Sequence, residues 1–557
     1  MSKKNRLIYL PLGGAGEIGM NMYVYGYGPA GKEEYILVDA GVTFPDMDGT
    51  PGVDLIMADA SWIIERADRL AAIFITHAHE DHVGALGLLW PQLQAPVYSR
   101  KFTAAIASNK MERAGVDAAN VKTVGPLPHM VEAGPFRVGF LPLSHSIPEA
   151  SGLVIDTPAG RIVHTGDFKC DPSPLVGEPF DPEAMREVAK PGVLALVCDS
   201  TNVFSPHAGR SETSLREPIT ELMATASGLV VATTFASNVA RLKTLAEGAK
   251  AAGRSVVVLG RAMRTMIQTG VETGVLKDFP AVVDIDLAND MPRGKVMVLA
   301  TGSQGERRAA SAQLAGDGYM GLSLKPDDTF LFSSKTIPGN ETGVARIWNA
   351  LAEKGVNVVA DDDRYHVSGH ANRPDLLEMQ ALINPQIVVP MHGEYRHLRK
   401  HAELSDENGR KTIIAPNGSL VDLSAEHPKV VEHIETGRTY LDGSLLINAL
   451  DGIVRERMHM ALRGHVIVNV MLDDSGEVLD APWAETLGVP APKGDFEALS
   501  AAIEEGVAAE LSRAKNRDLD KDSKVEELVK RAVNKVCKAE AGKKPVCTVL
   551  INRMEYE

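Results

Sequence analysis

The sequence predicts an α/β protein of several domains, and three observations lead to this fold class. The chain has 557 residues, which is too many for one ordinary hydrophobic core. In its first two hundred residues, short apolar stretches repeatedly end at a His or an Asp. From about residue 210, strand-like and helix-like stretches alternate, a pattern typical of a parallel sheet covered by helices.

The composition favours a globular protein of the cytoplasm. Apolar residues make up 44% of the chain and charged residues 24%. No apolar run approaches the ~18 residues that a membrane span needs, and the N-terminal stretch MSKKNRLIYL lacks the apolar region of a signal peptide. Four cysteines at unrelated spacings indicate neither a disulfide framework nor a zinc ribbon. We therefore expect a cytoplasmic protein with no membrane association.

The net charge of −15 argues against a broadly basic surface for nucleic acid. A nucleic-acid enzyme with this balance needs local basic residues and metal charge in its groove.

The first strands are expected at residues 6–26 and 34–41, and a short helix at 61–70. The turn GGAGEIG within the first stretch is similar to a dinucleotide-binding fingerprint. However, MNMYVYGYG follows it with strand character where such a site needs a helix, so we reject that interpretation. A long polar loop is expected over residues 42–60.

The stretch AIFITHAHEDHVGALG carries the densest group of ionisable side chains. Its apolar run predicts a buried strand, and a helix is expected to start at Val83. Residues two apart in an extended chain point the same way, so His77 and His79 can bind one cation. After a turn, Asp81 and His82 can face a second one. These ligand types suit Zn²⁺ or Mn²⁺.

Four later strands each end at a single residue of the same chemical kind. They bring His145, Asp167, Asp199 and His392 to strand ends, where sites are normally built. The strand that ends at His392 follows the α/β region but has the pattern of the first domain. We therefore predict that the α/β region is inserted within the first domain. After a charged stretch near residue 425 that marks a linker, a small separate α/β domain ends the chain.

We predict two metal sites that share one carboxylate. The ligands of the first cation are His77, His79 and His145, those of the second are Asp81, His82 and His392, and Asp167 bridges the two. A carboxylate between two cations ~3.5–4 Å apart helps to hold a hydroxide that is nucleophilic at neutral pH, and Asp81 takes part in this chemistry.

His370 is the candidate general acid. It lies in HVSGHANRPD, and the carboxylate of Asp199 is expected to orient it so that it protonates the leaving oxygen. The stretches TFASN, SSKTIPGNE and SGH offer hydroxyls and backbone N–H groups after strands, which can cradle phosphates. A structural histidine and ordinary loops are the competing interpretations.

The motifs HAHEDHVGAL, LSHSIPEA, HTGDFK, DSTN, TFASNVAR, TGSQGE, SSKTIPGNE, HVSGHA and PMHGEYRHL occur in this order along the chain. In this the chain resembles the ribonuclease J family, in the β-CASP branch of the metallo-β-lactamase-fold nucleases. The resemblance implies a metallo-β-lactamase αββα sandwich interrupted by a parallel α/β β-CASP domain. The implied parts are residues 1–210 and 371–430 (metallo-β-lactamase domain), 211–370 (β-CASP domain), 431–460 (linker) and 461–557 (C-terminal domain).

The resemblance also implies an activity and partners. The expected enzyme is a two-metal 5′-to-3′ exoribonuclease that prefers 5′-monophosphate single-stranded RNA and has additional endonuclease activity. In such an enzyme the hydroxide between the metals is expected to attack phosphorus. Its expected roles are RNA maturation and decay, including rRNA processing and mRNA decay. Homodimers or homotetramers held partly by the last domain are implied, with RNA-decay proteins as further partners and two Zn²⁺, or Mn²⁺, per subunit. The residues that match the grip on the RNA 5′ end are Phe235, Ala236, Ser237, His366, Val367, Ser368, Gly369 and His370.

Two stretches depart from the family pattern: GRAM, where GRSM is expected, and SPHAGRSE after DSTN. Neither includes a metal ligand, so they concern only the RNA contacts.

Two other functions compete with this one. A hydrolase of the same fold could act on DNA or on a small ester or lactam, but the inserted domain and HVSGHA disfavour small substrates, and His392 disfavours DNA-repair relatives that lack this histidine. A catalytically silent scaffold is the second alternative, which the intact ligand set disfavours.

Overall fold

The computed structural model describes residues 5–46, 48–425 and 427–554. It divides into two compact units. The first unit takes the chain up to Thr43 and then from Met57 to Arg438, and the second takes Phe44–Ile56 and the chain from Thr439 onward. Within the described residues, no helix combines the length and apolar character that crossing a membrane requires.

Two sheets packed face to face form the larger part of the first unit. In order across the first sheet, the strands are β24 (Lys429–His433), β23 (Ser419–Asp422), β1 (Asn5–Gly13), β3 (Met22–Pro29), β4 (Glu34–Val38), β7 (Leu70–Phe74), β8 (Val97–Ser99) and β9 (Val121–Thr123). Those of the second are β10 (Met130–Ala133), β11 (Phe136–Pro142), β12 (Ser151–Thr157), β13 (Gly160–His164), β14 (Ala195–Asp199), β20 (Ile387–Met391) and β22 (Lys411–Thr412).

The core between these sheets is apolar because alternate residues of each strand point into it. Tyr9 and Phe74 of the first sheet pack there with Phe140 and Val389 of the second. β14 pairs in parallel with both β13 and β20 and is buried along its whole length, as expected of a central parallel strand.

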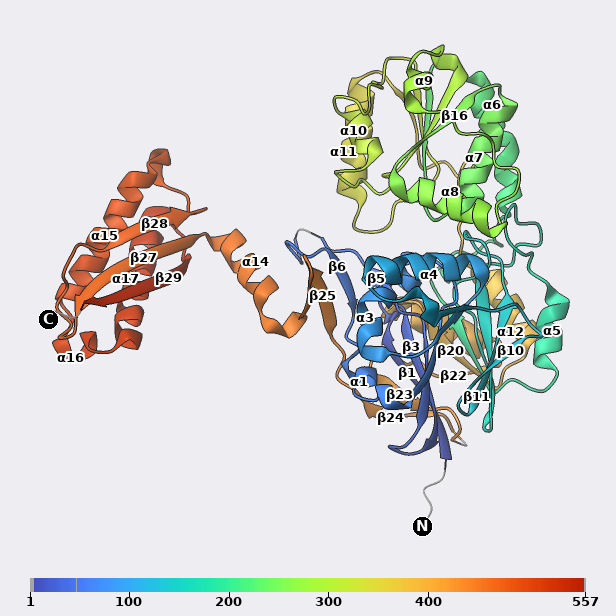
Figure 1. The fold of residues 1–557 in the computed structure, drawn as a ribbon, viewed down its shortest axis with the longest axis horizontal. Coiled ribbons are helices and arrows are strands. Elements are labelled where there is room, and N and C mark those ends of the chain that lie inside the picture. The colour runs from blue at the N-terminus through green and yellow to red at the C-terminus, as the bar shows by residue number, and fades with distance from the viewer. Residues whose placement is uncertain (1–4, 47, 426, 555–557) are drawn as a thin grey trace. The chain divides into compact units, whose positions relative to one another are not determined.

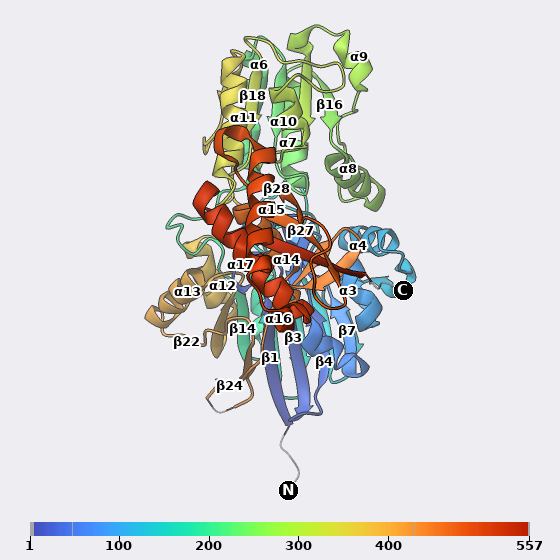
Figure 2. The same ribbon diagram turned by 90° about the vertical axis from the view of Figure 1, so that its left-hand side faces the viewer.

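Helices cover both outer faces of the sandwich. α5 (Pro182–Ala189) and α12 (Arg373–Ile383) bury Met185 and Leu376 against the second sheet. α4 (Lys101–Arg113) packs against β8 and β9 of the first sheet and against α3 (Leu86–Leu93). Figure 2 shows α12 and α13 (Tyr395–Glu407) on one side of the strands and α3 and α4 on the other. The predicted αββα sandwich is confirmed.

The segment between β14 and α12 forms a separate five-stranded parallel sheet. Its strands, in order, are β16 (Ser255–Leu259), β17 (Val296–Ala300), β15 (Val230–Thr233), β18 (Thr329–Phe332) and β19 (Asn357–Val359). One face packs against α9 (Ile285–Asn289), α10 (Ala310–Ala315) and α11 (Glu341–Glu353). α6 (Arg216–Thr225) and α7 (Val239–Ala251) lie on the other side, and α8 (Arg261–Thr273) runs across the lower end of the sheet (Figure 1). The predicted inserted α/β domain is confirmed.

The second unit is organised around one three-stranded sheet. β27 (His465–Asp473) pairs antiparallel with β28 (Trp483–Leu487) and parallel with β29 (Val546–Met554). α15 (Phe496–Ser512) and α17 (Asp522–Ala541) lie on one face (Figure 1), where Ile503 and Val529 are buried against Val468. This unit also contains β25 (Arg438–Asp442), β26 (Leu445–Asn448), α14 (Ile453–Arg463) and α16 (Asn516–Leu519).

Some local details differ from the sequence-based expectation. At the helix expected from Val83, the structure has two helices: the short α2 (Glu80–Val83), which ends at that residue, and α3, which begins at Leu86. Acidic residues in the first turn of α2 suit the positive end of the helix dipole. The polar loop at 42–60 holds the short strands β5 (Val42–Thr43) and β6 (Leu55–Ala58) and continues into α1 (Ser61–Ile64). The other short strands of the first unit are β2 (Ala15–Gly16) and β21 (Gly393–Glu394). The stretch at which we expect the linker to begin contributes β24, and the domain boundaries stay predictions.

Candidate metal centre

The predicted ligands converge at the ends of the sandwich strands. His77, His79, Asp81 and His82 follow β7, in the extended chain and the α2 turn beyond it. The other three follow β11, β13 and β20 of the second sheet. Their donor atoms form two clusters, His77, His79, His145 and Asp167 in the first and Asp81, His82, Asp167 and His392 in the second, with all atoms of a cluster within 4.8 Å of one another.

The first cluster has the spacing of a tetrahedral site. Nδ1 of His79 lies 3.1 Å from Nε2 of His77 and 3.1 Å from Nε2 of His145. Nε2 of His77 is 3.6 Å from Oδ2 of Asp167. Zn–N bonds of ~2.0–2.1 Å place tetrahedral ligands about 3.3 Å apart, so these donors fit a zinc ion.

Hydrogen bonds on the far side of two rings aim their lone pairs into this cluster. Nδ1 of His145 donates to the carbonyl oxygen of Gly369 at 2.6 Å, which leaves Nε2 as the acceptor atom. The hydroxyl of Thr76 donates to Asp39 and therefore accepts from Nδ1 of His77, 3.0 Å away. Burial holds the pKa of His77 and His145 well below the usual value, which keeps both rings in the neutral form that binds metal.

Asp167 joins the two clusters. Its Oδ2 faces the first cluster, whereas its Oδ1 lies 2.8 Å from Nδ1 of His392 and 3.3 Å from Nε2 of His82. Nε2 of His392 lies 3.3 Å from Oδ2 of Asp81. Burial opposes a charged His392, but the carboxylates of Asp167 and Asp81 raise the pKa of His392 to about 10. The carboxylates thus favour positive charge at the second cluster, and a cation bound there would take the place of the proton on His392.

The backbone at His392 is unusual for its residue type. Its φ is +50°, in the left-handed region that residues other than glycine rarely occupy. Such strain persists where the surrounding structure fixes it, and it often marks functional sites.

Two further residues hold the second cluster, and the sequence interpretation did not assign them to the site. Asp39 accepts from Nδ1 of His82 at 2.7 Å, which leaves the Nε2 of that ring facing the cluster. Nδ2 of Asn21 lies 3.1 Å from the Asp81 carbonyl and 3.0 Å from Nε2 of His82, and Tyr23 fixes this amide by donating to its Oδ1 at 2.7 Å. Asp39 ends a buried strand, so the rule that found the other acids could have found it.

His370 lies beside both clusters. Its Nδ1 is 2.8 Å from Oδ2 of Asp199, and its ring centroid lies 5.2 Å from that of His145 and 5.6 Å from that of His392. The amide and hydroxyl of Thr201 donate to the other Asp199 oxygen at 2.8 and 2.7 Å. Burial lowers the pKa of His370, but Asp199 and Asp167 outweigh it and raise that pKa above its usual value.

Donor atoms of these residues also form a third cluster. It consists of Asp167, Asp199, His370 and His392. On geometry alone, His370 is therefore either an acid or a further metal ligand.

The two loops expected to grip RNA are both tied to Ser333, at the end of β18. The carbonyl of Ser333 accepts from Thr234 at 3.1 Å, and its hydroxyl donates to the carbonyl of Tyr365 at 2.6 Å. The side chain of Val367 is buried, so only its backbone can contact a ligand. The half-buried members of the predicted set are Phe235, Ala236, Ser237, His366, Ser368, Gly369 and His370.

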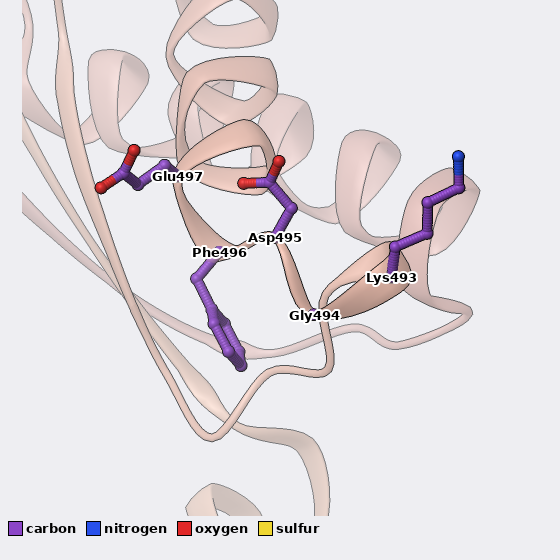
Figure 3. A pocket seen from close by; sticks show the side chains of 5 residues that line it. All are labelled: Lys493, Gly494, Asp495, Phe496 and Glu497. Atoms are coloured by element: carbon purple, nitrogen blue, oxygen red, sulfur yellow. The ribbon is translucent and has the colours of Figure 1, made fainter.

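A surface depression in the second unit is unrelated to these clusters. It lies at the start of α15 and is lined by residues 493–497. Asp495 accepts from the amide of Ala498 at 2.9 Å, as a helix cap does. Figure 3 shows Phe496 pointing away from the carboxylates of Asp495 and Glu497. None of these residues belongs to a metal cluster found among the described residues.

Comparisons with known families match most of the chain. Residues 16–198 match the metallo-beta-lactamase superfamily, and residues 227–351 the ribonuclease J beta-CASP domain. Residues 355–416 match the Zn-dependent metallo-hydrolase RNA specificity domain, and residues 452–554 the ribonuclease J C-terminal domain.

Individual proteins show the same likeness. Ribonuclease J of Sinorhizobium meliloti is 40% identical over 559 residues, covering 100% of this chain and 98% of the relative. Ribonuclease J of Thermus thermophilus is 34% identical over 473 residues, covering 83% of this chain and 82% of the relative. A crystal structure of an Enterococcus faecalis V583 protein of unknown function aligns with a TM-score of 0.50 at 18% identity, covering 74% of this chain and 99% of that one. That last likeness concerns the fold alone.

Proposed function

The chain belongs to the ribonuclease J family, and from this premise we propose that it is a metal-dependent ribonuclease. The observation that carries the proposal is Asp167, which turns one carboxylate oxygen toward each of two histidine-rich clusters. Two sites that share a carboxylate suit the cleavage of a phosphodiester, because the attacking and the leaving oxygen both carry charge.

We propose two Zn²⁺ ions, or Mn²⁺ in their place, as the cofactors. The first would be held by His77, His79 and His145 and the second by Asp81, His82 and His392, with Asp167 between them. When bound, such a pair supplies a hydroxide nucleophile at neutral pH and offsets the charge of the phosphate. The neutral rings of the first cluster and the carboxylates of the second match this use.

His370 is the proposed general acid. Asp199 holds its Nδ1 and favours the protonated ring, so Nε2 is the atom that can donate a proton to the leaving oxygen of the RNA. Thr201 fixes the carboxylate of Asp199 by donating to its second oxygen.

We further propose that the enzyme is a 5′-to-3′ exonuclease that prefers 5′-monophosphate RNA and also cleaves internally, acting in RNA maturation and decay. The half-buried loops 235–237 and 366–370, both tied to Ser333, support a grip on the 5′ end. Family membership is the basis for a cytoplasmic location, for RNA-decay proteins as partners and for the domain boundaries given above.

A homodimer or homotetramer is proposed as the working form. The open face of the three-stranded sheet in the second unit supports this. Trp483, Leu487, Leu550 and Met554 are each about half exposed there, at 51%, 50%, 49% and 47%. Exposed apolar side chains gathered on one sheet face are typical of a protein interface.

The deciding experiment is the digestion of end-labelled RNA that carries a 5′-monophosphate or a 5′-triphosphate, with His370→Ala as the control. Release of 5′ mononucleotides from the monophosphate substrate alone supports the proposed exonuclease. Internal fragments from both substrates would mean that endonuclease action dominates. Cleavage of DNA but not RNA by the metal-loaded protein would indicate another hydrolase of this fold, and no cleavage of either would favour the scaffold.

A further inference from the structure

Arg241 in α7 is among the largest fully buried side chains of the described chain. Its guanidinium forms two parallel hydrogen bonds with Glu212, from Nε at 2.6 Å and from Nη2 at 2.9 Å. Burying two charges is unfavourable even when they are paired, and an apolar pair is often at least as stable. Stability alone therefore does not explain this pair.

The remaining Arg241 hydrogen bonds go to the loops of the proposed site. Nη1 donates to the carbonyl of Ser333 at 2.6 Å and to that of Tyr365 at 3.3 Å, and Nη2 donates to the carbonyl of Val367 at 3.4 Å. Glu212 lies where the chain enters the inserted domain, and residues 365–367 lie where it returns. The guanidinium of Arg241 thus binds the segment that enters the inserted domain, the segment that leaves it, and the end of β18.

The same guanidinium also favours one position for the ring hydrogen of His366. Nη1 of Arg241 lies 3.3 Å from Nδ1 of His366. A guanidinium has hydrogens to donate and no lone pair to accept with, so a hydrogen bond between these two nitrogens requires Nδ1 to accept and leaves the ring hydrogen on Nε2. Burial and the charge of Arg241 lower the pKa of His366 to about 3, so the ring is neutral at ordinary pH. His366 therefore offers a single N–H donor from a half-buried position.

We propose that Arg241 is a positioning residue that makes His366 present its Nε2–H to the 5′-terminal phosphate of the RNA. The inference rests on the proposed function and deepens it. Arg241 does not touch the substrate. It acts by fixing the ring of His366 and the carbonyls on either side of it, so that the donor is already oriented when the RNA arrives.

The test compares 5′-monophosphate RNA with 5′-hydroxyl RNA of the same sequence. In Arg241→Lys, the charge opposite Glu212 is kept but the planar fork is lost. We expect the wild-type preference in kcat/KM for the monophosphate substrate to fall about ten-fold to a hundred-fold, the range for a lost hydrogen bond to a charged group. The change should lie mainly in KM. A merely structural defect would lower the rates on both substrates alike and leave their ratio unchanged.

A matched control is Arg254→Lys. Arg254 is also buried in the inserted domain, but it donates to the carbonyls of Met223, Gly228 and Val296, none of which belongs to the 365–367 segment. In Arg254→Lys, the ratio of kcat/KM for 5′-monophosphate RNA to kcat/KM for 5′-hydroxyl RNA should equal the wild-type ratio. If Arg241→Lys does not fold, the double variant Glu212→Gln/Arg241→Gln, which leaves no unpaired buried charge, takes its place in the same comparison.

The outcomes separate the inference from the function beneath it. A wild-type enzyme that does not distinguish the two RNA ends overturns the proposed 5′-end grip, and this inference with it. A wild-type enzyme that distinguishes them, together with a folded Arg241 variant of unchanged ratio, overturns the role of Arg241 alone.

Discussion

Nδ1 of His370 lies 2.8 Å from Oδ2 of Asp199, although 171 positions separate the two residues along the chain. The intervening segment contains the whole five-stranded parallel sheet. Asp199 ends β14, whereas His370 lies just before α12, on the return of the chain from the inserted domain. The pair therefore forms only when the insertion closes on itself.

This contact predicts the effect of Asp199→Asn. The amide cannot favour a protonated His370, so we expect RNA cleavage to fall by about 10²-fold or more, in the range for loss of a general acid. Single-turnover cleavage assays measure the effect. Bound metal should stay at the wild-type amount, measured by mass spectrometry of the metals. A loss of metal together with activity would instead assign Asp199 to the ligands.

Removing a metal ligand should lower the amount of bound metal as well as the activity. We expect His77→Ala to lose bound zinc and RNA cleavage together, because three imidazole nitrogens define the first cluster. The exposed His129 provides the control, since His129→Ala removes a histidine outside the site. Full zinc content and activity in His77→Ala would refute the assignment.

Added zinc should raise the unfolding temperature of protein stripped by a chelator. A ligand present at a hundred times its dissociation constant stabilises the folded state by about 2.7 kcal/mol. Differential scanning calorimetry with and without ZnCl₂ measures the shift. The double variant His77→Ala/Asp81→Ala lacks a ligand in each cluster, so added zinc should change its unfolding temperature little. A shift as large as that of the wild type would place the zinc site elsewhere.

Stability should depend on pH through His401. Burial lowers its pKa to about 4 in the fold, where its two ring nitrogens lie 2.9 Å from the hydroxyl of Ser200 and 3.1 Å from the amide nitrogen of Gln380. Between pH 6.5, the ordinary pKa of histidine, and pH about 4, the unfolded chain carries a proton on His401 that the folded chain lacks. As the pH falls through this window, the free energy of unfolding should drop by up to ~1.4 kcal/mol per pH unit from this residue.

Urea titrations at several pH values measure this effect. His401→Gln, which keeps a polar side chain and has no titrating ring, should show a flatter profile than the wild type. Profiles of equal slope would show that His401 is not the group responsible.

The proposed oligomer should depend on the open sheet face of the second unit. Leu550→Glu introduces a charge among its apolar side chains, and we expect a lower molar mass in light scattering coupled to size-exclusion chromatography. Leu450 is 82% exposed and belongs to a short helical turn outside this sheet, so Leu450→Glu should leave the mass unchanged. An unchanged mass for Leu550→Glu would exclude this face as the interface.

The sequence predicted the parts of the centre that follow a local rule. A buried strand that ends in His or Asp is visible in the chain itself, and this rule led to His145, Asp167, Asp199 and His392. The alternation of strand and helix likewise identified the inserted sheet. In both cases the pattern can be recognised within a window of about ten residues, because the side-chain periodicity of a strand or a helix repeats over that length.

Apart from Asp39, the supporting residues could not be found in this way. Asn21 is an ordinary polar residue until the fold brings it to Asp81 and His82. In the sequence, Arg241 is one basic residue of a predicted helix. Its hydrogen-bond partners, Glu212 and residues 365–367, are far away along the chain. β24 was expected to be linker because its charged residues resemble a loop, and pairing with β23 at the sheet edge gives it a strand conformation.

The shared centre has a mechanical consequence for the sandwich. The first and the second cluster each take donors both from the loop after β7, in the first sheet, and from loops of the second sheet. A bound cation is therefore a cross-link between the two layers, at one end of the core that they enclose. Sliding of one layer over the other would break metal–ligand bonds, so the ions that serve the chemistry also lock the register of the sheets.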